Sequence, residues 1–154
     1  MTGVMFICYG NICRSPMAEF LFKREIKNRG IEGGFNVVSR ATSDEETGNG
    51  VHYGTRKVLD GLGIDCSGKI AERLRKDDYG KFDYFLVMDG MNLRDTLAIF
   101  DGDPDKKVFR IMDFTTRPGD VADPWYTRNF NDTFNDVVAG IDGFLEYLKN
   151  NGKI

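Results

Sequence analysis

Residues 4–16 read Val4-Met5-Phe6-Ile7-Cys8-Tyr9-Gly10-Asn11-Ile12-Cys13-Arg14-Ser15-Pro16, the most informative segment of the chain. The apolar run predicts a buried strand, and Ser15 and Pro16 suit the N-cap and first position of a following helix. Backbone N–H groups of a tight loop between them would point inward and form a concave anion site. Arg14 can add a planar fork for two phosphate oxygens, and the same field should favour the attacking thiolate of Cys8. A buried structural cysteine beside a helix cap is the alternative interpretation.

The segment from Cys8 to Pro16 resembles the signature loop of the low-molecular-weight protein tyrosine phosphatases, which reads C-x-G-N-x-C-R-S-P. The resemblance implies hydrolysis of phosphotyrosine through a cysteinyl-phosphate intermediate, with Cys8 as nucleophile and Arg14 as the phosphate-binding cation. The remaining loop residues would bind the phosphate or line its site: Tyr9, Gly10, Asn11, Ile12, Cys13 and Ser15.

The resemblance also assigns supporting roles around the loop. Asn11 and Ser15 match positions that hold the loop shape and orient the thiolate, and Ser39 matches a serine that supports the asparagine. Cys13 matches a second loop cysteine that can form a reversible disulfide with the nucleophile, although a small core side chain is an equally compatible interpretation. Each of the polar residues taken alone is more typical of a turn or a cap.

A second catalytic group is expected in the segment Asp123-Pro124-Trp125-Tyr126. An aryl ester needs an acid to protonate the departing phenolate, and the same group can later deprotonate the attacking water. Pro124 biases Asp123 towards an extended conformation, which can aim a carboxylate. The resemblance implies that Asp123 is the general acid and that Trp125 and Tyr126 line the phenyl slot. Asp120 is a competitor without the proline and aromatic neighbours.

Strands and helices alternate along the chain. Apolar runs predict further strands at residues 35–39, 82–88 and 107–112, and helical periodicity predicts helices at 17–29, 55–62, 92–100 and 131–149. This alternation predicts an α/β fold, a three-layer sandwich with a central four-stranded parallel sheet and helices on both faces. The loop at Cys8 would then lie at a switch point beyond the carboxyl ends of the strands. We expect residues 1–154 to form a single phosphatase domain.

Composition narrows the possible partners and the compartment. The 154 residues carry 24 acidic and 21 basic side chains, a formal charge of −3, which favours neither nucleic acid nor a membrane surface as partner. No apolar run approaches the ~18 residues of a membrane span. Three scattered cysteines lack the spacing of a disulfide framework or a zinc site and favour the reducing cytoplasm. We expect no metal, no cofactor, a phosphotyrosine-containing protein or peptide as partner, and a monomer or weak dimer.

The sequence departs from the family pattern at two positions. Glu45 stands where the family often has an aromatic wall residue; an acidic rim would favour basic phosphopeptides, but a solvated carboxylate without a role is an equal alternative. Lys69 occupies the place of a histidine that many members have behind the loop, so loop support can differ here. The sole histidine, His52, is expected to be exposed in a glycine-rich loop.

Three other functions are alternatives to phosphotyrosine hydrolysis. A protein arginine phosphatase shares the scaffold but typically has threonine at the position of Ile12, so Ile12 favours tyrosine. A thioredoxin-coupled arsenate reductase needs two further cysteines after the third strand, and no cysteine follows Cys66. A noncatalytic phosphate-binding module has no use for Cys8 as nucleophile or for Asp123 as acid.

Overall fold

Four parallel strands form the centre of the protein, in the computed structural model that describes all of residues 1–154. The strands are β1 (Thr2–Cys8), β2 (Phe35–Ala41), β3 (Tyr84–Val87) and β4 (Val108–Arg110), and their order in the sheet is β2-β1-β3-β4. The chain leaves β1 towards β2 and crosses back to β3, so the loop after β1 lies at the switch point of the sheet.

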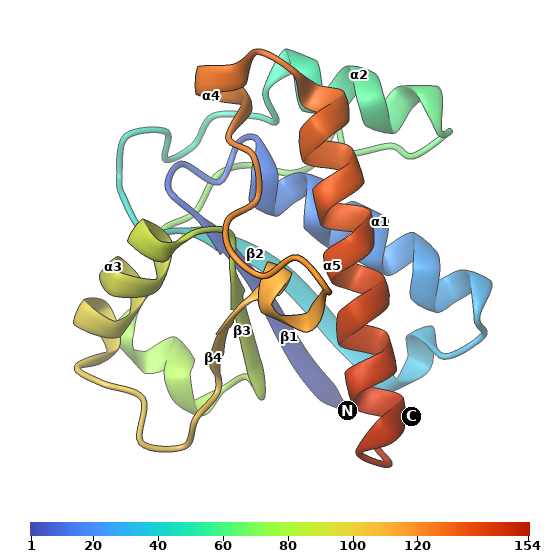
Figure 1. Cartoon of the computed structure of the whole chain (residues 1–154). Coiled ribbons are helices and arrows are strands. Elements are labelled where there is room, and N and C mark those ends of the chain that lie inside the picture. Colours follow the sequence, from blue (N-terminus) through green and yellow to red (C-terminus); the bar gives the residue numbers. More distant parts are fainter.

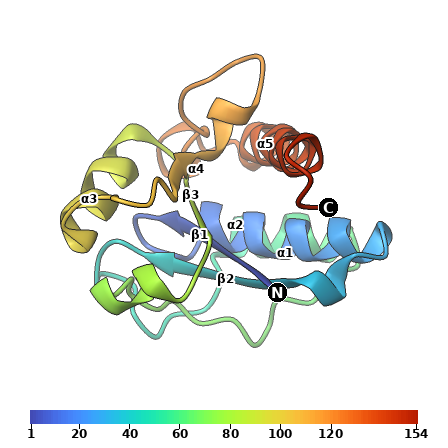
Figure 2. The same cartoon turned by 90° about the horizontal axis from the view of Figure 1, so that it is seen from below.

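Helices cover both faces of this sheet (Figures 1 and 2). The long helices α1 (Arg14–Asn28) and α5 (Phe130–Asn150) pack together on one face, with α2 (Tyr53–Gly61) beside them. The other face is covered by α3 (Gly90–Phe100) and the 3₁₀ segment Lys76–Gly80. The predicted α/β three-layer sandwich is therefore confirmed.

Alternate residues of β1 enter two different cores, as a strand buried on both faces requires. Val4, Phe6 and Cys8 belong to the core under α1 and α5, where Phe22 and Phe144 also lie. Met5 and Ile7 belong to the smaller core on the other face. Cys8 thus sits at the carboxyl end of a fully buried strand, so its position is fixed by packing on both sides.

The first helix begins two residues earlier than predicted, at Arg14 rather than Pro16. Cys13 is its N-cap residue and Arg14 its first residue, so the prediction that Ser15 caps the helix is wrong. The Ser15 hydroxyl faces the Cys8 thiol instead. Pro16 suits the first turn of the helix, because an N–H at that position would have no helical carbonyl to bind. At its other end the helix stops as predicted near Gly30, which has a positive φ of 70°.

The other helices and strands shift by a few residues from their predicted bounds. Helix α2 starts at Tyr53 because the His52 ring accepts a hydrogen bond from the Gly54 N–H (3.0 Å) and caps it. His52 also stacks on Phe130 with 5.4 Å between ring centres, so it is half-buried rather than exposed as expected. The last strand is shorter than predicted because residues 111–114 turn into a 3₁₀ segment that buries Ile111 and Met112.

A short helix, α4 (Pro124–Thr127), separates the last strand from α5 and was not predicted. None of the helices is long and apolar enough to cross a membrane.

Candidate active site

The thiol of Cys8 is surrounded by hydrogen-bond donors at the end of β1. The backbone N–H groups of Asn11 and Ser15 point at Sγ, at 3.3 and 3.4 Å, and the Ser15 hydroxyl lies 3.0 Å away. Because Ser15 Oγ already accepts a hydrogen bond from the Asn11 side chain (2.8 Å), its own proton is free to donate to sulfur. Three donors converging on one buried sulfur stabilise negative charge there.

Asn11 holds the loop in shape through all of its polar side-chain atoms. Its Nδ2 donates to the hydroxyls of Ser15 (2.8 Å) and Ser39 (2.9 Å), and its Oδ1 accepts from the Glu72 N–H (3.1 Å). The residue is buried and has a φ of 59°, a left-handed conformation that asparagine tolerates better than most residues. The predicted contacts between Asn11, Ser15 and Ser39 are thus present.

Behind Ser39 lies a buried carboxylate that sequence reasoning missed. The Ser39 hydroxyl donates to Glu19 Oε1 (2.6 Å), and Lys23 pairs with the other Glu19 oxygen (2.6 Å). Glu19 lies four residues after Ser15 on α1, so it shares the inward helix face with it. That spacing is the only sequence signal that could have identified Glu19.

Lys69 completes this support from behind the loop. Its ammonium donates to the Ser39 carbonyl (2.9 Å) and lies 3.6 Å from Glu19 Oε1. Burial lowers the pKa of Lys69, although the Glu19 carboxylate opposes that change. The lysine therefore occupies the histidine position of the family pattern and supports the loop through a charge pair and a carbonyl contact.

Arg14 is almost fully buried, and two carboxylates flank its guanidinium. Nη1 lies 2.8 Å from Asp89 Oδ2, and Nη2 lies 3.3 Å from Asp123 Oδ2. Burial alone would lower the pKa of Arg14, but the charges of Cys8, Asp123 and Asp89 outweigh it and the pKa is raised. Arg14 is thus a permanent cation beside the Cys8 thiol.

Asp89 is the second residue that sequence reasoning missed. It lies two residues beyond the end of β3 and caps α3, accepting a hydrogen bond from the Asn92 N–H (2.7 Å) with one oxygen while the other faces Arg14. An aspartate between the end of a parallel strand and a helix is a signal for this position, since strand ends meet at one edge of the sheet.

Asp123 reaches the site from the loop before α4. Its Oδ1 caps α4 by accepting from the Trp125 N–H (3.0 Å), which leaves Oδ2 directed at Arg14. The preceding loop is tied to α5, where Asp136 accepts from the Ala122 N–H (2.9 Å). The competing Asp120 turns away and accepts from the Gly90 N–H (3.0 Å), so of these two aspartates only Asp123 contacts Arg14.

The rim of the site is aromatic on one side and acidic on the other. Trp125 and Tyr126 are 67% and 82% exposed, and Tyr9 is 41% exposed. A hydrogen bond with Glu45 raises the pKa of the Tyr9 hydroxyl. Glu45 therefore lies close to Tyr9 at the rim. Ile12 is half-buried in the loop.

The remaining loop residues give the pocket its inner surface. Cys13 is buried, and burial together with the neighbouring Cys8 raises the pKa of its thiol to about 12. Both thiols are free. Gly10 lies beside the Glu46 side chain, which a Cβ on Gly10 would meet at 3.4 Å. No group of three or more metal-ligating side chains is placed to hold an ion.

Taken together, a thiol ringed by donors, a buried guanidinium and a carboxylate within 3.3 Å of that guanidinium define a cysteine-dependent phosphate site. The chain matches the family model described as low molecular weight phosphotyrosine protein phosphatase over residues 3–153. It is 35% identical over 149 residues to the low molecular weight protein-tyrosine-phosphatase PtpA of Staphylococcus aureus, covering 96% of this chain and 94% of that protein.

Two solved structures agree with this match. YfkJ from Bacillus subtilis superposes with a TM-score of 0.93 at 31% identity, covering 98% of this chain and 96% of that one. The low molecular weight protein tyrosine phosphatase SP-PTP from Streptococcus pyogenes superposes with a TM-score of 0.85 at 36% identity, covering 96% and 93%. The chain therefore belongs to the low molecular weight phosphotyrosine protein phosphatase family and is an enzyme of that class.

Proposed function

We propose that this chain hydrolyses phosphotyrosine in proteins through a phosphocysteine formed on Cys8. The observation that carries the proposal is the convergence of three donors on Cys8 Sγ beside the buried Arg14 guanidinium. The loop N–H groups and Arg14 would bind the three nonbridging phosphate oxygens and stabilise the charge that they carry in the transition state. Residues 1–154 would work as one catalytic domain.

The reaction would proceed in two displacements. The Cys8 thiolate attacks phosphorus, the bond from phosphorus to the tyrosine oxygen breaks, and the protonated Asp123 gives its proton to the departing phenolate. Asp123, now a carboxylate, takes a proton from a water molecule that attacks the phosphocysteine. The bond from sulfur to phosphorus then breaks, phosphate leaves, and Cys8 returns as a thiolate.

The rim residues would bind the phenyl ring of the substrate. Tyr9, Trp125 and Tyr126 are exposed aromatic side chains around the mouth, and Ile12 adds a half-buried apolar contact from the loop. Such a lining suits an aryl group, and Ile12 lacks the hydroxyl that the threonine of arginine phosphatases would offer to the guanidinium of phosphoarginine. Ile12 therefore supports tyrosine over arginine as the phosphorylated residue. The three free thiols support a reducing compartment, the cytoplasm, and we expect a monomer or weak dimer.

The test compares phosphate release from matched phosphotyrosine and phosphoarginine peptides, with EDTA present, for the wild type, Cys8→Ser and the control Cys66→Ala. Cys66 is a buried thiol outside the loop, so its variant controls for the loss of any cysteine. We expect release from phosphotyrosine by the wild type and the control only. Phosphate release from the phosphoarginine peptide alone would show that phosphoarginine, and not phosphotyrosine, is the substrate. Phosphate binding without turnover in the wild type would indicate a binding module.

A further inference from the structure

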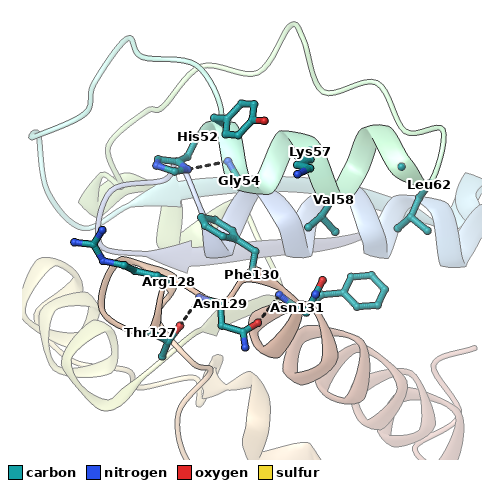
Figure 3. Close-up of a pocket in the computed structure, with 13 residues that line it drawn as sticks. His52, Gly54, Lys57, Val58, Leu62, Thr127, Arg128, Asn129, Phe130 and Asn131 are labelled. Carbon is teal, nitrogen blue, oxygen red and sulfur yellow. Dashed lines mark hydrogen bonds between the residues drawn. The ribbon is translucent and has the colours of Figure 1, made fainter.

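A large groove lies between α2 and the start of α5, outside the loop that holds Cys8. Its volume is about 870 Å³. Val58 of α2 and Leu62, which directly follows α2, line it together with Phe130 and Phe134 of α5, and Figure 3 shows the Phe130 ring directed at the start of α2. A Cβ on Gly54 would overlap that ring, so the two elements meet closely at this end of the groove.

The charge of the groove is opposite to that of the whole chain. None of its 13 lining residues is acidic, although the protein carries a net charge of −3. Lys57 on α2 and Arg128 after α4 are both exposed and form no ion pair with any carboxylate. Two uncompensated cations beside an apolar surface favour a ligand that combines carboxylates with apolar side chains.

The groove begins at the active site. The N–H of His52, which lines the groove, donates to the Ile12 carbonyl of the phosphate loop (2.8 Å). On the other side, Thr127 and Arg128 follow Asp123 by four and five residues, at the end of α4. A polypeptide with its phosphotyrosine in the loop can therefore lie along the groove as it leaves the mouth.

The exposed apolar side chains mark the same path. Nine large hydrophobic residues are exposed in this protein, and five of them belong to the phosphate loop, α4 and α2 or its end: Tyr9, Tyr53, Leu62, Trp125 and Tyr126. Tyr53 and Leu62 line the groove, and Trp125 and Tyr126 directly precede Thr127, which also lines it. Exposed apolar side chains that gather at one place are typical of an interaction surface. Helix α2 has nine residues and is about 13 Å long at 1.5 Å per residue, which matches about four residues of an extended peptide.

We propose that this groove binds a substrate segment of about four residues, rich in Asp or Glu and carrying an apolar side chain, that flanks the phosphotyrosine. The proposal rests on the proposed function, because it names the class of phosphoprotein that the same active site accepts. On the loop side of the mouth, Glu45 and Glu46 repel acidic residues, so the acidic segment is accepted on one flank of the phosphotyrosine only.

The experiment uses phosphotyrosine peptides of equal length. One carries Glu-Leu-Glu-Phe before the phosphotyrosine, one carries it after, and their partners carry Lys-Leu-Lys-Phe or Gln-Leu-Gln-Phe at the same places. Each kcat/KM is divided by that for p-nitrophenyl phosphate measured on the same variant. For the wild type we expect about five- to tenfold preference for glutamate over glutamine on one flank, decreasing as salt is raised.

The variants reverse charge at the groove or far from it. Lys57→Glu removes one of the two cations, and Lys57→Glu/Arg128→Glu removes both and changes the net charge by −4. The control pair Lys27→Glu/Lys76→Glu makes the same change of −4 at exposed sites away from the groove. We expect loss of the glutamate preference in the groove variants, mainly through KM, and its retention in the control pair. Equal kcat/KM for all wild-type peptides, or equal loss in the control pair, would overturn the proposal. Absence of all peptide and p-nitrophenyl phosphate hydrolysis would instead overturn the proposed function.

Discussion

Arg14 and Asp123 lie in contact, with 3.3 Å between Nη2 and Oδ2. The contact holds Asp123, the proposed general acid, beside the cation that would bind phosphate. A phosphate dianion would compete with Asp123 for the Arg14 donors. The arrival of substrate would thus free the Asp123 carboxyl group to turn towards the leaving oxygen.

Removal of the Asp123 carboxyl group should therefore affect substrates according to their leaving groups. For Asp123→Ala we expect about a hundredfold loss of kcat on phenyl phosphate, and a loss of less than about tenfold on p-nitrophenyl phosphate, whose phenolate leaves with little help. Steady-state kinetics on both esters checks this. Asp120→Ala is the matched control, because Asp120 lies on the same loop but binds the Gly90 N–H. Equal losses on the two esters would contradict the general-acid role.

Asp89 should act on phosphate binding through Arg14. Asp89→Asn keeps an oxygen that can cap α3 but removes the charge that pairs with Arg14 at 2.8 Å. We expect the guanidinium to lose its fixed orientation, with KM for phosphotyrosine and the inhibition constant for inorganic phosphate both rising by about tenfold. Asp113→Asn, an exposed partner of Arg110, serves as control. Unchanged inhibition by phosphate in Asp89→Asn would show that Arg14 needs no such partner.

Lys69 should tune the nucleophile without touching it. Its contacts run through Glu19 and Ser39 to Asn11, whose N–H meets Cys8 Sγ. In Lys69→Met the Ser39 carbonyl loses its ammonium donor, and Glu19 keeps Lys23 as its remaining cation. We expect kcat to fall about fivefold to tenfold with little change in KM, and the acidic limb of the kcat/KM profile to move to higher pH.

Rescue separates this positioning role from a general loss of stability. Lys69→His should restore part of the rate, because an imidazole can donate to the same Ser39 carbonyl, whereas Lys76→Met at an exposed site should leave the profile unchanged. A lower rate in Lys69→Met with an unmoved pH profile would mean that the lysine contributes only to folding.

The sequence predicts those parts of the site that depend on local order. The loop from Cys8 to Ser15 is one continuous segment of the sequence, and Asp123 is marked by the Asp-Pro pair, so both could be found without a structure. Asp89 and Glu19 could not be assigned, because their roles depend on partners 75 and 20 residues away, Arg14 and Ser39. Packing across the sheet brings these pairs together.

Predictions from local sequence also failed where tertiary contacts determine the structure. Ser15 has the chemistry of a helix cap, but its hydroxyl is used by Cys8 and Asn11, so the helix starts at Arg14 without a side-chain cap. His52 looked like a loop residue because its partner Phe130 lies 78 residues further along the chain. Both differences occur at the edge of the sheet where the active site lies.

The thiol of Cys13 gives a prediction with a defined pH range. Its pKa is about 12 in the folded protein against an ordinary value of 9.0, mainly because it is buried. Between these values the folded protein keeps the proton and the unfolded chain releases it. This contribution to the free energy of unfolding is therefore complete below pH 9 and is lost as the pH rises towards 12.

At pH 8 the same effect should protect Cys13 from alkylation. We expect iodoacetamide to modify Cys8 first, because donors stabilise its thiolate, and to modify Cys13 only when the protein unfolds. Peptide mapping by mass spectrometry after timed alkylation, with and without denaturant, measures both sites. In Cys8→Ser the protection of Cys13 should persist, since burial is its main cause and the Cys8 charge only adds to it. Rapid modification of Cys13 in the folded protein would show that its side chain reaches solvent, and the fall in stability between pH 9 and 12 would then be absent as well.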